Sequence, residues 1–207
     1  MDFSQSSFND FDRLMIKIIE QAYKSKEIRK KNINGYNYYK GISTENVAVY
    51  INIDTKKLIY AIKGTSNKKE LLLDLKLNIA NPIFTKSLKQ RNQMNTILHH
   101  FGKLYNNYKM KYDIFITGHS LGGIKAHYIN SSYPNVKGTT YNSYFPFTNT
   151  NEFRNLYKNS KLKQIIILGD ILSNEVIKYV GSVIKKNPPS IFKYNILAHT
   201  ISTLKQL

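Results

Sequence analysis

The octapeptide ITGHSLGG at residues 116–123 is the feature that most constrains this chain. It contains the pattern G-x-S-x-G as Gly118, Ser120 and Gly122, with an apolar run before it and a helix-like stretch after it. In that context the pattern is typical of a nucleophile elbow, a sharp turn that presents a serine between a buried strand and a helix. A glycine-rich structural turn is the alternative for the bare pattern. The flanking segments favour the elbow.

Apolar residues before this motif predict one helix and three strands. From Ser7 to about Lys30 they recur at helical spacing, and the Ser7 side chain is expected to cap the helix start. Strands are predicted at residues 36–42, 46–54 and 57–65, which are rich in Tyr, Val and Ile. Because a tight turn separates the last two strands, we expect them to form a hairpin.

Around the motif and after it, strands alternate with helices. Residues 94–108 have helical apolar spacing, and residues 112–117 are typical of a buried central strand in a parallel sheet. Further strands are predicted at 137–142, 163–170 and 192–199, with a helix at 151–157. The alternation predicts an α/β fold, specifically an α/β-hydrolase fold with a mostly parallel central sheet flanked by helices. Without repeats or a linker, residues 1–207 are expected to form a single domain.

A reactive serine needs a base within hydrogen-bond distance and a carboxylate that orients the base. In the α/β-hydrolase order the acid and then the base follow the serine along the chain. The carboxylates after Ser120 are Glu152, Asp170 and Glu175. Asp170 directly follows the apolar run IIILG, so it is expected at the carboxyl end of a strand, where α/β sites gather. Asp170 is therefore the predicted acid, because the two glutamates are expected in helices or loops.

Two histidines follow the serine, His127 and His199. His127 lies about two helical turns beyond the motif, which favours a packing or surface role. His199 ends the last apolar run and is the predicted base. His119, inside the motif, is expected to be a packing and hydrogen-bonding neighbour, and the pair at residues 99–100 is expected at the surface or between helices.

Stabilising the oxyanion of an acyl-transfer reaction requires hydrogen-bond donors from two places. One is the amide of the residue after the nucleophile, here Leu121. The other is expected from a loop after an earlier strand, and Gly64 and Thr65 close the third predicted strand. Thr65 is therefore the predicted side-chain donor, although a simple hairpin end is the alternative for these two residues.

The chain contains no cysteine, which excludes disulfides, a thiolate nucleophile and a cysteine-ligated metal site. We expect no metal and no cofactor. The amino terminus is acidic and polar, and no run of about 18 apolar residues occurs. These features predict neither a signal peptide nor a transmembrane segment, and they favour a cytoplasmic location or one inside a virion or host cell.

The formal net charge is +18, from 31 Lys and Arg against 13 Asp and Glu. Such a charge attracts polyanions such as nucleic acid or an anionic membrane. An AT-rich coding sequence, which enriches Lys, Asn, Ile and Tyr, explains the composition equally well. Because no helix-turn-helix or zinc pattern is present, nucleic acid ranks low among the expected partners. The sequence makes no prediction about the oligomeric state.

Four segments in order, IKGTSNKKELLLDL, ITGHSLGGIKAH, LGDILSN and AHTIS, resemble the class 3 lipase family. The resemblance extends over about residues 8–205. It implies an oxyanion donor at Thr65, a nucleophile at Ser120, an acid at Asp170 and a base at His199. It also implies a lid over the stretch after Thr65, where leucines alternate with lysines in a way suited to an anionic lipid surface. Packing of these leucines into the core is the alternative.

The resemblance implies a serine esterase or lipase that hydrolyses acylglycerol-like lipid esters through an acyl-enzyme. Two alternatives remain: a phospholipase acting on anionic membranes, and a non-catalytic basic module that binds nucleic acid or membranes. The chain also departs from the family pattern. Lys63 replaces the usual arginine, residues 139–147 read TTYNSYFPF in place of a pocket-shaping block, and the disulfides of secreted members are missing.

Overall fold

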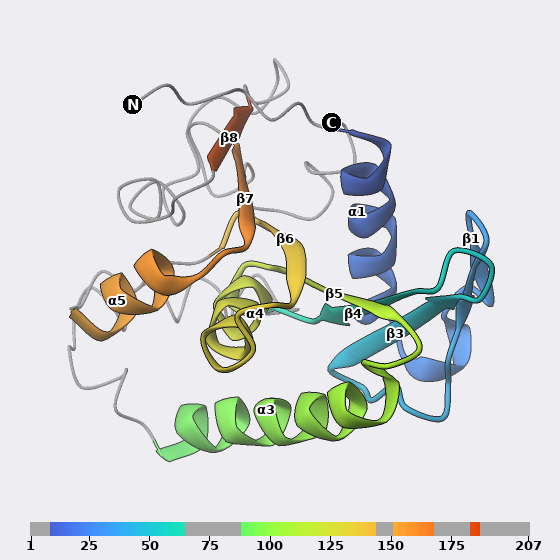
Figure 1. Cartoon of the computed structure of the whole chain (residues 1–207), viewed down its shortest axis with the longest axis horizontal. Coiled ribbons are helices and arrows are strands. Elements are labelled where there is room, and N and C mark those ends of the chain that lie inside the picture. Colours follow the sequence, from blue (N-terminus) through green and yellow to red (C-terminus); the bar gives the residue numbers. More distant parts are fainter. Residues whose placement is uncertain (1–8, 65–87, 144–150, 168–182, 187–207) are drawn as a thin grey trace.

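The chain folds into a layered arrangement of strands and helices (Figure 1). In a computed structural model of the chain, the described residues are 9–64, 88–143, 151–167 and 183–186. The described helices are α1 (Asp10–Ala22), the 3-10 helix η1 (Lys26–Ile28), α3 (Leu88–Tyr108), α4 (Leu121–Ser132) and α5 (Asn151–Asn159). The described strands are β1 (Asn32–Ile33), β2 (Tyr36–Tyr38), β3 (Val47–Asn52), β4 (Lys57–Ile62), β5 (Asp113–His119), β6 (Lys137–Tyr141), β7 (Lys163–Ile167) and β8 (Val183–Lys186).

The strands form one mixed sheet in the order β1 to β8. From β1 to β4 neighbouring strands are antiparallel, and from β4 to β8 they are parallel. The predicted hairpin is confirmed, with Val47 opposite Ile62 and Asn52 opposite Lys57. The predicted central strand is also confirmed, because β5 lies between two parallel neighbours. The predicted α/β fold with a mostly parallel sheet is therefore correct.

Helices cover both faces of the sheet, with α1 on one face and α3 and α4 on the other (Figure 1). Alternate side chains of β4 enter opposite layers, as expected for a strand buried on both sides. Ile59 and Ala61 belong to the cluster around α1, whereas Leu58, Tyr60 and Ile62 belong to the cluster around α3 and α4. This central position brings the carboxyl end of β4 beside the end of β5.

Helix α1 is shorter than predicted at both ends. It begins at Asp10, and its cap is Asn9 rather than Ser7: the Asn9 side chain accepts the Asp12 N–H, and the Asp12 carboxylate accepts the Asn9 N–H. It ends at Ala22 rather than near Lys30. Arg29 explains that end, because its buried guanidinium donates to five acceptors elsewhere in the fold. These tertiary hydrogen bonds outweigh the helical spacing of the sequence.

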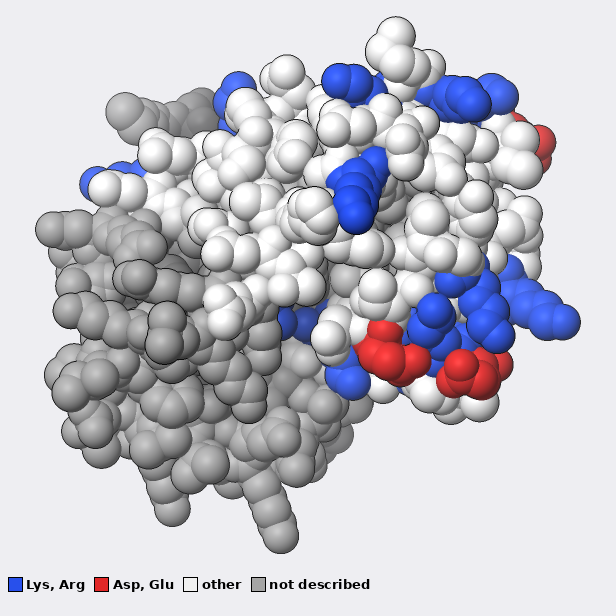
Figure 2. Space-filling model, turned by 90° about the horizontal axis from the view of Figure 1, so that it is seen from below, with Lys and Arg blue, Asp and Glu red and all other residues white. Residues whose placement is uncertain are grey.

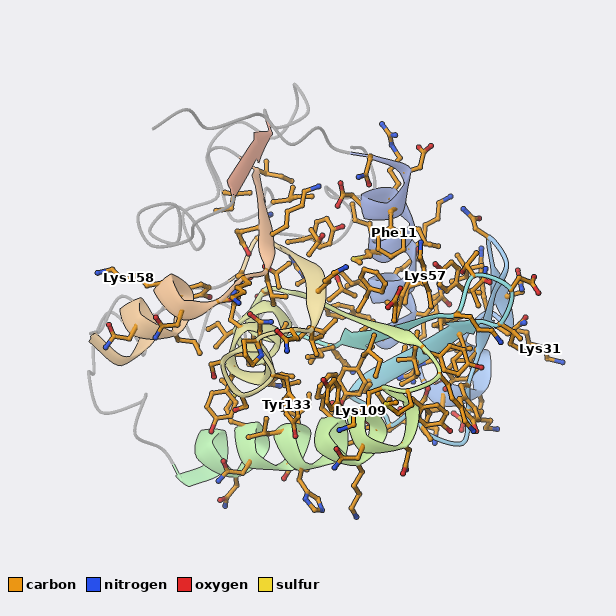
Figure 3. The ribbon with its side chains drawn as sticks, viewed as in Figure 1. Phe11, Lys31, Lys57, Lys109, Tyr133 and Lys158 are labelled. Atoms are coloured by element: carbon orange, nitrogen blue, oxygen red, sulfur yellow. The ribbon has the colours of Figure 1, made fainter. Side chains whose placement is uncertain are left out.

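Helix α1 runs along the β4 and β5 strands. Near its start, the Phe11 ring meets the Phe115 ring edge to face at 4.9 Å, and the Lys57 amine lies 5.3 Å from the centre of the Phe11 ring (Figure 3). Asp12 pairs with Lys163 at 2.6 Å and so ties the helix to β7. A helix of 13 residues and a strand of six are both about 20 Å long. Because the two lengths match, Tyr23, the residue after α1, lies at the carboxyl end of β4.

The remaining predicted elements agree with the structure in kind and differ at their ends. The strands predicted at 36–42 and 137–142 are found as the shorter β2 and β6, and the helix predicted at 94–108 begins earlier, at Leu88. The strand predicted at 163–170 is found as β7, with residues 168–170 outside the described ranges. The helix predicted at 151–157 is α5. Strands β1 and β8 were not predicted, because they are short and polar. The strand predicted at 192–199 lies outside the described residues.

Candidate active site

The GHSLGG motif folds into a sharp strand-to-helix turn. β5 ends at His119, α4 begins at Leu121, and Ser120 between them has φ 57° and ψ −126°. For a residue other than glycine such a backbone conformation costs about 1–3 kcal/mol, so surrounding contacts must hold it. The Ser120 N–H donates to the Tyr141 carbonyl at 3.2 Å, and the Ser120 carbonyl accepts the Gly123 N–H at 2.9 Å. The predicted shape of the turn is confirmed, whereas the role of Ser120 as nucleophile stays a prediction.

Glycines let the turn pack directly against the end of β4. A methyl group on Gly118 would overlap the Gly122 carbonyl, and one on Gly122 would overlap the Ile62 carbonyl. A methyl group on Gly64 would overlap the carbonyl of His119. Two backbone segments are therefore in van der Waals contact here, and both the motif and the predicted oxyanion loop need glycine for that approach.

The hydroxyl of Tyr23 links the same two segments. It accepts the Gly64 N–H at 3.2 Å and lies 2.9 Å from the Nδ1 atom of His119. Burial raises the pKa of the Tyr23 phenol far above its ordinary value, although the Gly64 amide opposes this shift. His119 is thus the hydrogen-bonding neighbour that the sequence predicted. No sequence pattern indicated Tyr23, because its partners lie 41 and 96 residues away in the chain.

The other predicted site residues fall at the borders of the described structure. Leu121 is half-buried and is the first residue of α4, where backbone N–H groups have no partner within the helix. Thr65 follows directly on Gly64, but Thr65, Asp170 and His199 lie outside the described residues. Their roles stay predictions.

His127 is fully buried on the inner side of α4. Its Nδ1 atom lies 2.7 Å from the Ser160 hydroxyl, and its Nε2 atom lies 3.0 Å from the Thr140 hydroxyl and 3.3 Å from the Gln164 carbonyl oxygen. Burial lowers the pKa of His127 to about 4, although the hydrogen bond to the side-chain oxygen of Gln164 opposes this shift. Both nitrogens have partners in the core, so the predicted packing role is confirmed.

The histidines of α3 differ from each other. His99 is exposed. His100 is half-buried, and its Nδ1 atom lies 2.8 Å from the hydroxyl of Tyr60 on β4. His99 lies at the surface as predicted, and the half-exposed His100 in addition has a partner on a strand, which the sequence did not indicate. Burial lowers the pKa of His100 below its ordinary value.

The comparison with protein families agrees with this geometry. The model of the family described as "Lipase (class 3)" matches residues 59–174, which is more than half of the chain and includes most of β4 and the strand-to-helix turn. The chain belongs to the class 3 lipases. Membership identifies it as a carboxylic ester hydrolase that acts on lipid esters. None of the curated proteins searched matches the chain.

Solved structures of fungal lipases have the same fold as this class 3 lipase. The Lip2 lipase of Yarrowia lipolytica has a TM-score of 0.54 at 17% identity, covering 87% of this chain and 79% of that one. The MDLA N225Q mutant of Penicillium cyclopium has a TM-score of 0.56 at 13% identity, and the alignment covers 96% of this chain and 87% of that one. The mono- and diacylglycerol lipase of Aspergillus oryzae has a TM-score of 0.51 at 11% identity, and the alignment covers 94% of this chain and 86% of that one. At these identities the similarity establishes the α/β-hydrolase fold and nothing finer.

The positive charge of this class 3 lipase is dispersed over the described surface. On the face in Figure 2, lysines and arginines lie in several separate groups, one of them beside acidic side chains. Lys31 and Lys158 lie on opposite sides of the molecule (Figure 3). Among the described residues, His, Asp and Glu side chains form no group of three that could hold a metal ion. Within the same ranges, every helix is too short or too polar to cross a membrane.

Proposed function

We propose that this class 3 lipase hydrolyses acylglycerol-like esters through a Ser-His-Asp triad, with Ser120 as the nucleophile. The backbone of Ser120 is the observation that most supports the proposal. A buried serine is held at φ 57° between a parallel strand and a helix, at the carboxyl edge of the sheet. This is the conformation of a nucleophile elbow, and α/β enzymes bind their substrates at that edge.

In the proposed reaction the Ser120 hydroxyl attacks the ester carbonyl carbon. His199 takes the hydroxyl proton and delivers it to the departing alcohol, while Asp170 orients the imidazole and stabilises its cation. The Leu121 amide and the Thr65 side chain donate hydrogen bonds to the oxyanion of the tetrahedral intermediate. Water, activated by the same base, then cleaves the acyl-enzyme and releases the fatty acid.

The surroundings of the described histidines support His199 as the base by elimination. His127 is enclosed by polar core residues, His100 is bonded to Tyr60, and His119 is bonded to Tyr23. His99 is exposed on α3. For Asp170, the support is its place shortly after β7, a parallel strand of the same sheet. Continuity of the sheet from β1 to β8 supports one domain over residues 1–207.

The substrate proposal rests on the family and on the sequence after Thr65. Residues 66–82 combine leucines with lysines, which suits contact with an anionic lipid surface. The Aspergillus oryzae neighbour is a mono- and diacylglycerol lipase. A phospholipase acting on anionic membranes is the alternative within the same chemistry.

Ester hydrolysis by purified protein tests the proposal. Fluorogenic esters of graded chain length would be assayed with and without anionic phospholipid vesicles, and release of fatty acid from the vesicles would be measured in parallel. We expect Ser120→Ala to lower kcat at least about 1,000-fold. Ser132→Ala, the same change at an exposed position on the same helix, should leave kcat unchanged. Equal activity of wild type and Ser120→Ala would refute the proposal.

The charge of +18 favours a second candidate, a non-catalytic module that binds anionic membranes or nucleic acid. This candidate predicts binding to DNA or anionic vesicles that weakens steeply with salt and is the same in wild type and Ser120→Ala. It also predicts that neither protein hydrolyses any ester in the series. Ester hydrolysis by wild type but not by Ser120→Ala would exclude this non-catalytic role as the main function.

A further inference from the structure

We propose that Tyr23 is a positioning residue for the oxyanion hole, holding Gly64, the residue before the predicted donor Thr65, at a fixed distance from the Ser120 turn. The inference rests on the proposed function and adds to it a residue from a part of the chain that the family match, at residues 59–174, does not include. Tyr23 lies at the end of α1, where its N–H caps the helix by donating to the Glu20 carbonyl.

One hydroxyl contacts the residue that precedes the predicted donor Thr65 and the residue that precedes Ser120. Gly64, whose N–H donates to the Tyr23 hydroxyl, directly precedes the predicted donor Thr65. His119, whose Nδ1 atom lies 2.9 Å from that hydroxyl, directly precedes Ser120. A shift of the Tyr23 hydroxyl therefore changes the spacing between Gly64 and the Ser120 turn.

The Tyr23 hydroxyl has the hydrogen-bonding capacity for both partners at once. It accepts the Gly64 N–H, and its proton and second lone pair remain available for the Nδ1 atom of His119. Burial raises the pKa of the phenol above its ordinary value, so the proton stays on the oxygen at neutral pH. One neutral hydroxyl thus connects the end of β4 to the Ser120 turn.

The packing leaves little freedom for either segment to compensate. A methyl group on Gly64 would overlap both the His119 carbonyl and the Tyr23 hydroxyl, and the Gly122 N atom would lie 3.3 Å away. Without the hydroxyl, the Gly64 N–H would lose its partner and the loop would lose one of its contacts with the turn. Oxyanion donors act only at about 2.7–3.1 Å from the developing charge, so a shift of a few tenths of an ångström reduces their effect.

Contacts along α1 hold Tyr23 in place. Close to Tyr23, the side chains of Ile18, Ile19 and Ala22 are fully buried against the sheet. The ion pair between Asp12 and Lys163 anchors the first turn of the helix. Because α1 spans the length of β4, these contacts fix how far Tyr23 reaches toward the carboxyl edge.

A second pair provides a matched control. The Tyr60 hydroxyl lies 2.8 Å from the Nδ1 atom of His100, and burial also raises the pKa of Tyr60. This pair has the same chemistry as Tyr23 and His119, but Tyr60 belongs to the cluster around α3 and α4, on the other face of the sheet. Replacing either tyrosine by phenylalanine removes one hydroxyl and one tyrosine–histidine hydrogen bond, and at Tyr23 it also removes the acceptor of the Gly64 N–H.

The test compares Tyr23→Phe with Tyr60→Phe in the full chain. We expect Tyr23→Phe to lower kcat about 10-fold to 100-fold with KM within twofold of wild type, and to slow phosphonylation of Ser120 by a fluorophosphonate to a similar degree. Tyr60→Phe should change neither, although both variants should lower Tm, Tyr23→Phe by more because the Gly64 N–H also loses its acceptor. Amide hydrogen exchange at Gly64 should accelerate in Tyr23→Phe alone.

Equal kcat in Tyr23→Phe and Tyr60→Phe would overturn the inference, as would unchanged exchange at Gly64. A loss of activity that only follows a loss of folded protein would overturn it too. Failure of the proposed function looks different, because wild type would then neither hydrolyse esters nor react with the fluorophosphonate. The oxyanion role of Tyr23 would be refuted with it, whatever the exchange at Gly64.

Discussion

The turns at the two ends of the β4–β5 pair each contain a non-glycine residue with positive φ, but the surroundings of these two residues differ. At the amino end, Lys56 adopts φ 53° in the turn that leads into β4, and its side chain is exposed. At the carboxyl end, Ser120 adopts φ 57° in the turn that leaves β5, and only 2% of its surface is exposed. The Lys56 carbonyl accepts the Asp113 N–H at 2.8 Å, whereas the Ser120 turn packs against backbone on several sides.

The difference separates a conformation required by a turn from one maintained by the surrounding fold. Around Lys56 there is room, so any residue that tolerates positive φ can replace it. Around Ser120 there is no free space, because Gly118 and Gly122 allow neighbouring backbone to approach within contact distance. Strained conformations of this kind persist only where the surroundings impose them, and they gather at functional sites. We predict that the two ends respond very differently to substitution.

Gly122→Ala should have the largest effect. The added methyl group would overlap the Ile62 carbonyl, so the turn must move away from β4. We expect a loss of about 3–5 kcal/mol in the free energy of unfolding, measured by urea denaturation, together with loss of ester hydrolysis. Gly41→Ala is the control, because the nearest atom to its methyl group would lie 3.7 Å away in ordinary contact. Equal stability of the two variants would contradict the packing described for the turn.

His127 should make the stability of the turn region depend on pH. Burial lowers the pKa of His127 to about 4 in the folded chain, whereas an unfolded histidine titrates near its ordinary value of 6.5. The unfolded state therefore binds more protons between these values, and stability is complete above pH 6.5 and falls toward pH 4. Across that window His127 alone contributes a loss of about 3 kcal/mol.

Urea denaturation at several pH values measures this slope. In His127→Gln, which keeps hydrogen-bonding capacity but does not titrate, the slope between pH 6.5 and pH 4 should be shallower than in wild type. An identical slope in the two proteins would show that the His127 ring is not held neutral in the core.

Glycine substitutions at the two positive-φ residues should give the smallest effects and the most direct comparison. Lys56→Gly should stabilise the chain by about 0.5–1 kcal/mol and leave ester hydrolysis unchanged, because it relieves strain at an exposed turn. Ser120→Gly should raise stability by a comparable amount while abolishing hydrolysis. Urea denaturation and an ester assay on both variants test this pair. Retained activity in Ser120→Gly, or lost activity in Lys56→Gly, would contradict the view that the carboxyl end is functional and the amino end is only a turn.

The sequence was sufficient to predict the local features at the carboxyl end. The apolar run, the glycines and the following helical stretch predicted the shape of the turn around Ser120, and alternation predicted the β3–β4 hairpin. Periodicity overestimated α1, since the capping box of Asn9 and the buried guanidinium of Arg29 determine its ends. Such side-chain contacts over long sequence distances leave no periodic signal.

Long-range placement also explains what the sequence could not predict at the site. The contact of Tyr23 with Gly64 and His119 depends on the length of α1 relative to β4 and on how the helix is anchored. Likewise, the full enclosure of His127 depends on side chains from β6, from β7 and from Ser160, which follows α5. Order along the chain predicted Asp170 and His199, and their roles stay predictions.

Mapping the covalent adduct of a fluorophosphonate by peptide mass spectrometry tests the central claim most directly. The account predicts one adduct per chain, on the peptide that contains Ser120, with loss of ester hydrolysis in proportion to labelling. It also predicts no adduct in Ser120→Ala. An adduct on any other residue, or full hydrolysis by protein completely modified at Ser120, would contradict the account.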